Sequence, residues 1–330
     1  MGNMKKISDI KVVAVGGGTG LSTMLRGIKL YTKNIDVIVT VADDGGSSGM
    51  IREELHILPP GDIRNCLTSL ADAEPLMREL FRYRFKSGRL EGQSFGNLFI
   101  AAMCDLTGDF ETAIEKMSSV LAVTGNVLPV TKDNINLKAT MQNGSVVVGE
   151  SRIPDEAMSQ GTAISKIELE PKDAKAFDKC IKAIENADII VLGPGSLYTS
   201  IIPNLLVDGI TSAISQSKAK KVYVCNVMTQ PGETSGYSAY DHLAAIVEHM
   251  GLNCIDYCIA NSAPILEDAL KKYLRKNADS VEPDRANFEN IPTELVTADL
   301  LYVDEEKMIL RHDYIKLAQL ILSLCNNENE

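Results

Sequence analysis

The sequence predicts an α/β fold: a Rossmann-like three-layer sandwich with a mostly parallel sheet, helices on both faces and a small β excursion. Two observations support this prediction. Short apolar, β-branched runs alternate with amphipathic helical runs along the chain, as in doubly wound proteins. A glycine cluster at 16–20 separates the first strand-like run from the first helical run, where such folds bind phosphate. We expect one domain over residues 1–330.

Each expected strand is short, apolar and rich in β-branched residues, which suits a parallel strand buried on both faces. The expected strands are 11–15, 36–42, 189–192, 221–226 and 254–260. The runs between them repeat apolar residues at helical spacing. The expected helices are 21–30, 63–71, 75–85, 96–106, 111–121, 174–186, 239–249 and 264–275, and another amphipathic helix follows 311–313.

A stretch at about 127–171 interrupts this alternation. The runs 134–140 and 146–149 flank Asn143-Gly144, a pair typical of tight hairpin turns, and the run 163–169 offers a third strand. Because three short strands bury little core, we expect a small β excursion rather than a separate domain. It could cover the ligand cleft or pair with another subunit, and the sequence does not distinguish these roles.

Charge and composition limit the classes of partner. A formal net charge of −11 argues against nucleic acid or an anionic membrane as the main partner. No apolar run approaches the roughly 20 residues that span a bilayer, and no apolar signal segment follows the first lysines. The seven cysteines are scattered and lack zinc-type pairing, which suits a reduced compartment. We therefore expect a cytoplasmic protein.

The turn after the first strand is the first expected ligand site. Its glycines let a ligand approach the main chain, and the free N–H groups at the start of a helix favour an anion. The candidate residues are Gly17, Gly18, Thr19, Gly20, Leu21 and Ser22. Leu21 stands where G-x-G-x-x-G needs its third glycine, and no Walker Lys-Ser/Thr follows. A tight turn without ligand is the alternative.

Acidic residues follow the second expected strand. Asp43 and Asp44 should lie beside the first turn, because the carboxyl ends of neighbouring parallel strands face one crevice. One of them could bind a sugar hydroxyl or a Mg²⁺ ion, and Asp44 is the candidate metal ligand. In the alternative interpretation both residues only cap a turn.

The segment 58–65 also offers polar groups to this crevice. Asp62 is a good helix N-cap, and Arg64 and Asn65 fall in the first helical turn. A cation in a first turn opposes the helix dipole, so we expect Arg64 to face an anion.

Later strand ends and two distant residues complete the expected site. Small and hydroxyl-bearing residues after successive strands suggest one elongated site for a nucleotide or phosphosugar. The candidates are Asn97, Gly193, Pro194, Gly195, Ser196, Thr199, Asn226, Thr229, Gln230, Tyr273 and Arg311. The last two could close over a diphosphate or a uracil ring.

Six motifs in order resemble those of the YvcK-type gluconeogenesis factors, relatives of the CofD family of 2-phospho-L-lactate transferases. They are Gly16-Gly-Gly-Thr-Gly-Leu-Ser, Ala42-Asp-Asp-Gly-Gly-Ser-Ser-Gly, Pro60-Gly-Asp-Ile-Arg-Asn, Phe95-Gly-Asn-Leu, Gly193-Pro-Gly-Ser-Leu-Tyr-Thr-Ser and Met228-Thr-Gln-Pro-Gly-Glu-Thr. The resemblance implies a CofD-like domain that binds a nucleotide, notably a UDP-sugar such as UDP-N-acetylglucosamine. It also implies a cytoplasmic role in cell shape and cell-wall synthesis during growth on gluconeogenic carbon sources.

Three functional hypotheses stay open at this point. The first is a regulator that binds a UDP-sugar and acts through protein partners in cell-wall regulation; the second is a Mg²⁺-dependent transferase, with Asp44 and Asp62 as its matching acidic residues. Gly-Gly-Ser-Ser-Gly after the aspartates and Arg-Asn after Asp62 depart from the transferase pattern, which favours the regulator. The third, an oxidoreductase with a bound dinucleotide, lacks the glycine fingerprint. The sequence does not indicate which proteins the chain binds or whether it forms a homo-oligomer.

Overall fold

The computed structural model describes residues 5–251, 254–304 and 309–325. Its central sheet contains seven strands in the order β10-β9-β8-β7-β1-β2-β3, and all neighbouring strands in it are parallel. The strands are β1 (Val12–Gly16), β2 (Ile35–Val39), β3 (Asn126–Pro129), β7 (Ile189–Leu192), β8 (Lys220–Val224), β9 (Tyr257–Asn261) and β10 (Glu294–Ala298). The predicted Rossmann-like α/β fold is confirmed. Strand order reverses between β1 and β7, so the ligand crevice of such a sheet is expected at their carboxyl ends.

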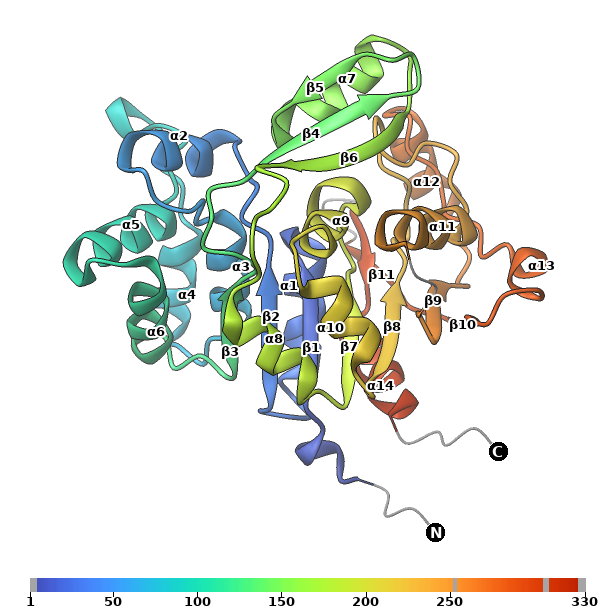
Figure 1. Ribbon diagram of the computed structural model, residues 1–330, viewed down its shortest axis with the longest axis horizontal. Helices are drawn as coiled ribbons and strands as arrows, with labels where there is room; N and C mark the ends of the chain where they lie inside the picture. Colours follow the sequence, from blue (N-terminus) through green and yellow to red (C-terminus); the bar gives the residue numbers. More distant parts are fainter. Residues whose placement is uncertain (1–4, 252–253, 305–308, 326–330) are drawn as a thin grey trace.

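Helices cover both faces of this sheet (Figure 1). Val13 and Val15 of β1 point into one core, whereas Val12 and Ala14 point into the other, because successive strand residues face opposite sides. Helices α8 (Asp178–Glu185), α10 (Ile210–Gln216) and α11 (Ala239–Met250) contribute to the first core. The second core contains residues of α1 (Gly18–Ile28), α3 (Gly61–Leu70), α5 (Phe95–Thr107), α6 (Phe110–Val120) and α14 (Tyr314–Leu324).

Helices α1 and α14 lie against each other at a glycine. A Cβ atom on Gly27 would overlap the backbone carbonyl of Tyr314, so the two helices approach more closely there than a side chain allows. The other helices are α2 (Gly46–Leu55), α4 (Pro75–Arg82), α7 (Ile153–Ser159), α9 (Ile202–Leu205), α12 (Glu267–Leu274) and α13 (Arg285–Phe288). Short 3-10 or π segments cover Ile7–Asp9, Gly88–Leu90, Glu150–Arg152 and Leu197–Ile201.

The predicted β excursion is present as a three-stranded antiparallel sheet of β4 (Asn136–Met141), β5 (Val146–Val148) and β6 (Ile164–Glu170). It lies beyond the carboxyl ends of the main strands (Figure 1) and touches the loop after β2, where Ser151 N donates to Asp44 at 2.8 Å. It begins later than the predicted residue 127, because β3 joins the main sheet. A second small sheet pairs β11 (Leu301–Asp304) with β12 (Ile309–His312).

Some predicted boundaries are wrong. The second strand ends at Val39 rather than at 42, and β9 begins at Tyr257 rather than at 254. The glycine-rich run after Asp44, which lies in none of the expected helices, forms the start of α2. Glycine is a poor helix former, but α2 is held against α5, where Ser94 N donates to Ser47 Oγ at 3.1 Å. Tertiary packing therefore decides this segment.

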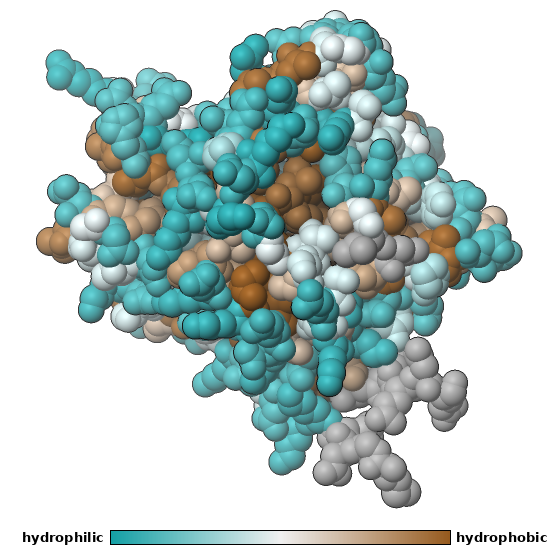
Figure 2. Space-filling view, in the orientation of Figure 1, coloured by the Kyte–Doolittle hydropathy of each residue, from teal (hydrophilic) through white to brown (hydrophobic). Residues whose placement is uncertain are grey.

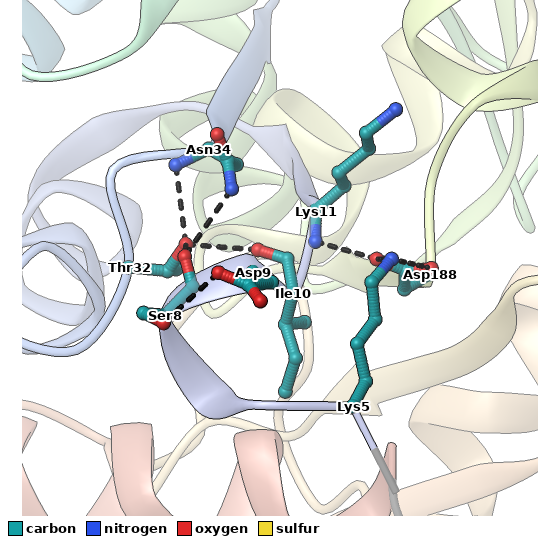
Figure 3. A network of polar contacts seen from close by, with 8 residues as sticks. All are labelled: Lys5, Ser8, Asp9, Ile10, Lys11, Thr32, Asn34 and Asp188. Carbon is teal, nitrogen blue, oxygen red and sulfur yellow. Dashed lines mark hydrogen bonds and ion pairs between the residues drawn. The ribbon is translucent and has the colours of Figure 1, made fainter. Parts of the chain in front are cut away.

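Hydrogen bonds fix the amino-terminal ends of three adjacent strands (Figure 3). The Asp188 carboxylate, just before β7, accepts from Lys11 N at 2.7 Å and pairs with Lys5 Nζ at 2.6 Å. Thr32 Oγ1, in the loop before β2, donates to the carbonyl of Ile10 at 2.9 Å and accepts from Asn34 N at 3.1 Å. These contacts hold the lead-in to β1 between its two neighbours, at the end of the sheet opposite to the crevice.

The visible face is mostly hydrophilic, with apolar residues in separate patches (Figure 2). Patches of this kind are ordinary on globular proteins. Among the helices in the described ranges, none has the length and apolar character that crossing a bilayer requires.

Candidate functional site

A cavity of about 530 Å³ opens where β1, β7 and β8 end. Three loops after these strands form one wall, and α12 and β12 form the other. Of the residues predicted from the sequence, those that line this cavity are Gly18, Thr19, Gly20, Pro194, Gly195, Ser196, Asn226, Thr229, Gln230, Tyr273 and Arg311. The structure thus brings together residues from five separate parts of the sequence.

The glycine turn needs small residues for two different reasons. Gly18 has a φ of +71°, and a Cβ atom there would meet only Ser200 Oγ, at 3.8 Å; the backbone angle, rather than crowding, requires glycine. At Gly20 a Cβ atom would lie 2.7 Å from the carbonyl oxygen of Pro194. The turns after β1 and β7 therefore touch. Leu21 is fully buried in the core, so only its main chain could serve a ligand.

Side-chain amides join the loops after β7 and β8. Asn226 Nδ2 donates to the carbonyl of Gly195 at 2.8 Å, and Gln230 Nε2 donates to Ser196 Oγ at 2.7 Å. These bonds hold the cavity wall in place without a ligand.

The opposite wall depends on Tyr273. Its hydroxyl accepts from the backbone N–H of Leu310 at 2.9 Å, which ties α12 to β12. Arg311, the next residue on β12, lines the cavity together with Lys276. The two residues that seemed remote in the sequence are therefore linked through one strand.

A smaller cavity of about 220 Å³ adjoins the first and shares Thr19, Thr23 and Arg311 with it. Ser22 and Asn65, two further predicted residues, line this smaller cavity. Two of its three arginines, Arg26 and Arg82, were not predicted from the sequence.

The predicted aspartates gather on the other side of the glycine turn. Asp62 lies against Gly17, where a Cβ atom would overlap its carboxylate. Burial, and then the charge of Asp43, raise the pKa of Asp62 to about 6. Asp43 Oδ1 accepts from Gly45 N at 2.9 Å, as the turn-cap interpretation requires. The predicted N-cap role of Asp62 is wrong, because Pro60 is the N-cap and Asp62 lies inside the first turn.

Two glutamates that were not predicted complete this acidic region. Glu150 follows β5, and burial together with Asp43, Asp62 and other carboxylates raises its pKa to about 8. Glu233 accepts from Tyr198 N at 3.2 Å, and burial raises its pKa to about 7. Glu233 was visible within the motif Gln-Pro-Gly-Glu-Thr, whereas no local signal marked Glu150. Within the described ranges, no three His, Cys, Asp or Glu side chains form a group that could hold a metal ion.

Arg64 lines neither cavity. Its guanidinium donates to Ser94 Oγ at 2.5 Å, to Asn97 Oδ1 at 3.0 Å and to Asn65 Oδ1 at 2.7 Å. All three acceptors are neutral, and no ion pair to a carboxylate is present within the described ranges. Asn97 donates in turn to Ser47 Oγ at 3.3 Å. Arg64 and Asn97 thus connect α2, α3 and α5 behind the glycine turn.

Two more predicted residues support the loop after β7 from within. Thr199 Oγ1 donates to Glu233 Oε1 at 3.4 Å, and Gly193 N donates to the carbonyl of Val15 at 2.9 Å. Gly193 has a φ of +79°, a value that favours glycine.

A seven-stranded parallel sheet with helices on both faces defines this chain as a Rossmann-like α/β protein. The chain belongs to the CofD family, since the family model described as 2-phospho-L-lactate transferase CofD matches residues 12–301.

Close relatives cover almost the whole chain. A relative from Thermoanaerobacterium thermosulfurigenes is 52% identical over 324 residues, which are 98% of this chain and 99% of the relative. The gluconeogenesis factor of Bacillus subtilis is 46% identical over 315 residues, 95% of this chain and 98% of that protein. A crystal structure of a UPF0052 family member from Bacillus halodurans superposes with a TM-score of 0.90 at 47% identity, covering 95% of this chain and 100% of that one.

Proposed function

We propose that this chain is a regulatory protein that binds a nucleotide diphosphate ligand, foremost a UDP-sugar such as UDP-N-acetylglucosamine. The observation that carries the proposal is the 530 Å³ cavity at the switch point of the sheet. Its volume falls within the range of small-molecule sites. The start of α1 offers backbone N–H groups for a diphosphate, and Arg311 supplies a cation across the cavity.

The relatives' name supports the physiological part of the proposal. Several relatives carry the name gluconeogenesis factor. We place this chain in the cytoplasm, where ligand binding would be transmitted to protein partners that control cell shape and cell-wall synthesis on gluconeogenic carbon sources.

A transferase is the second candidate, and the acidic region favours it. Asp43 and Asp62 lie beside the glycine turn, and their carboxylate oxygens, with phosphate oxygens of a bound ligand, suit Mg²⁺. Asp44 is less suited, because both of its carboxylate oxygens face the segment after β5: Oδ1 accepts from Ser151 N at 2.8 Å, and Oδ2 would lie 2.7 Å from a Cβ atom on Gly149. The regulator proposal predicts no turnover of UDP-N-acetylglucosamine with Mg²⁺. Turnover at about 1 per second, an ordinary enzyme rate, would favour the transferase.

Calorimetric titration of the purified chain tests the binding proposal. UDP-N-acetylglucosamine, NAD, NADP and GDP are each titrated with and without Mg²⁺, and saturable binding of the UDP-sugar is expected. Gly18→Val should abolish this binding. The space beside Gly18 is open and belongs to the cavity, so the valine side chain would occupy the volume that the diphosphate needs.

Gly92→Val is the matched control for Gly18→Val. Gly92 has a φ of +80° with nothing within 4 Å of a Cβ atom, so both variants carry a similar backbone strain. Only Gly18 lines the cavity. Equal UDP-sugar affinity in the two folded variants would contradict the placement of the diphosphate at this turn.

A further inference from the structure

The smaller cavity has a lining that is unusual for a protein interior. It lies between α1, α3, α4 and β12, and its lining residues are Thr19, Ser22, Thr23, Arg26, Asn65, Thr68, Ser69, Arg82 and Arg311. Three are arginines, five carry hydroxyl groups and one carries an amide, so the lining contains no carboxylate and no apolar side chain. Such a set can bind only a polar ligand, and its charge selects an anion.

In the part of the chain that the structure describes, the arginines have no acidic partner. Within the described ranges, Arg26, Arg82 and Arg311 form no ion pair with a carboxylate. Arg26 is half-buried, its Nη2 donates to Thr23 Oγ1 at 3.3 Å, and its Cζ lies 5.3 Å from the ring centre of Tyr314. Burial, then the charge of Arg82, lower the pKa of Arg26.

The convergence of these cations is unfavourable in the absence of an anion. Like charges in a half-buried position repel each other, and water screens them only in part. A bound dianion would reverse the sign of this interaction and accept charged hydrogen bonds from the guanidinium groups.

The hydroxyl groups divide into two sets. Those of Ser22 and Thr23 donate to the carbonyl of Thr19 at 3.0 and 2.9 Å, and Thr68 donates to the carbonyl of Arg64 at 2.7 Å. The hydroxyls of Thr19 and Ser69 have no hydrogen-bond partner in the part of the chain that is described. They can therefore donate to a ligand beside the arginines.

The volume limits the ligand to a small group. At about 220 Å³ the cavity is below the usual range for a nucleotide-sized ligand, but a phosphate group with a few carbon atoms is compatible with it. Because Thr19, Thr23 and Arg311 also line the larger cavity, occupants of the two cavities would be neighbours.

We propose that the cavity around Arg26, Arg82 and Arg311 is a second anion site, which binds a phosphomonoester or inorganic phosphate next to the nucleotide site. This goes beyond the proposed function, since it assigns a second ligand. It does not depend on which nucleotide occupies the larger cavity. Shared Arg311 would make the affinity for each ligand depend on the other.

A single tryptophan provides a local signal for the test. The chain contains no tryptophan, so Tyr314→Trp places the only indole beside Arg26. Inorganic phosphate and glycerol 3-phosphate are titrated separately into this variant, with sodium chloride at equal ionic strength as the reference. We expect a saturable fluorescence change with phosphate and none with chloride. A lower dissociation constant for glycerol 3-phosphate than for inorganic phosphate would identify an organic phosphomonoester as the preferred ligand.

Variants in the Tyr314→Trp background locate the site. Arg82→Gln should raise the dissociation constant for phosphate at least tenfold, and because Arg82 is exposed the variant should fold. Arg78→Gln, one turn earlier on α4 and also exposed, does not line the cavity and should leave the constant unchanged. The proposal is overturned if phosphate gives no saturable signal, or if both variants weaken binding equally.

A repeat at saturating UDP-N-acetylglucosamine separates this site from the glycine turn. Phosphate should still bind and should still respond to Arg82→Gln. Complete loss of phosphate binding under these conditions would assign the phosphate to the larger cavity and overturn the second site. Failure of the UDP-sugar to bind would contradict the proposed function alone, because the phosphate titration does not require it.

Discussion

Replacing Glu150 should change how the stability of the ligand-free protein depends on pH. Its pKa is raised from 4.5 to about 8 in the folded chain, so folded Glu150 keeps a proton that the unfolded chain releases near pH 4.5. The free energy of unfolding must therefore fall as pH rises from about 4.5 through 8. Asp62 and Glu233, with pKa values of about 6 and 7, act in the same direction.

The size of the effect follows from the shift. At 1.36 kcal/mol per pKa unit, a change from 4.5 to about 8 corresponds to on the order of 5 kcal/mol, fully developed only above pH 8. Glu150→Gln keeps the shape of the side chain and removes the charge. The variant should therefore become more stable than the original chain as pH rises, by a few kcal/mol at pH 9.

Urea unfolding of both proteins between pH 6 and pH 9 measures this difference. Buried histidines whose pKa values are lowered act in the opposite direction below about pH 6.5, but they cancel in the comparison of variant and original. Asp155→Asn removes an exposed carboxylate on α7 and serves as the control, with little expected change. If the stability of Glu150→Gln declines as steeply as that of the original chain, the account of this acidic region is wrong.

Three further substitutions test the framework of the site. Arg64→Ala should lower the unfolding free energy by about 1 to 3 kcal/mol, because buried Ser94 loses a partner. Since Arg64 lines neither cavity, UDP-sugar affinity should change less than this stability does, and an unchanged unfolding free energy would contradict the structural role. Gly27→Ala should lower the melting temperature, because its Cβ atom would overlap the carbonyl of Tyr314. This is expected although alanine is the better helix former by about 1 kcal/mol. An equal or higher melting temperature would contradict the close approach of α1 and α14. Tyr273→Phe removes the hydroxyl that accepts from the backbone N–H of Leu310 in β12. The UDP-sugar dissociation constant should rise roughly threefold or more, a cost within the range of one hydrogen bond. Equal affinity would exclude a role for Tyr273 in positioning β12.

The central strands of the main sheet could be predicted from the sequence because each is a continuous apolar run. The predicted strand 189–192 coincides with β7, and that for β1 differs by one residue. Edge strands gave a weaker signal: β3 contains a proline and β10 reads Glu-Leu-Val-Thr-Ala. An edge strand pairs on one side only, so its composition is less restricted.

Site residues that directly follow strands could be predicted from the sequence, whereas residues on helices and on the small sheet were mostly missed. Loops after β1, β7 and β8 could be assigned to one crevice because parallel strands share a carboxyl end. Glu150 was missed because it reaches Asp43 and Asp62 from the segment after β5, and no local pattern indicates where the small sheet lies. Arg26 did leave a signal, since Thr19, Thr23 and Arg26 repeat at helical spacing on α1 and form a polar stripe. That stripe identifies the face of α1 that lines the smaller cavity.

The close contact of α1 with α14 also determines when the site can exist during synthesis. Nearly the whole described chain separates the two helices, and a ribosome that adds 5 to 20 residues per second needs roughly 15 to 60 seconds to make it. During that interval the apolar face of α1 has no partner from α14, β1 lacks its neighbour β7 for much of the time, and Arg311 has not yet been added. A nascent chain can present the glycine turn early, but it cannot enclose a ligand there until β12 has emerged, and α14 reaches α1 only after that.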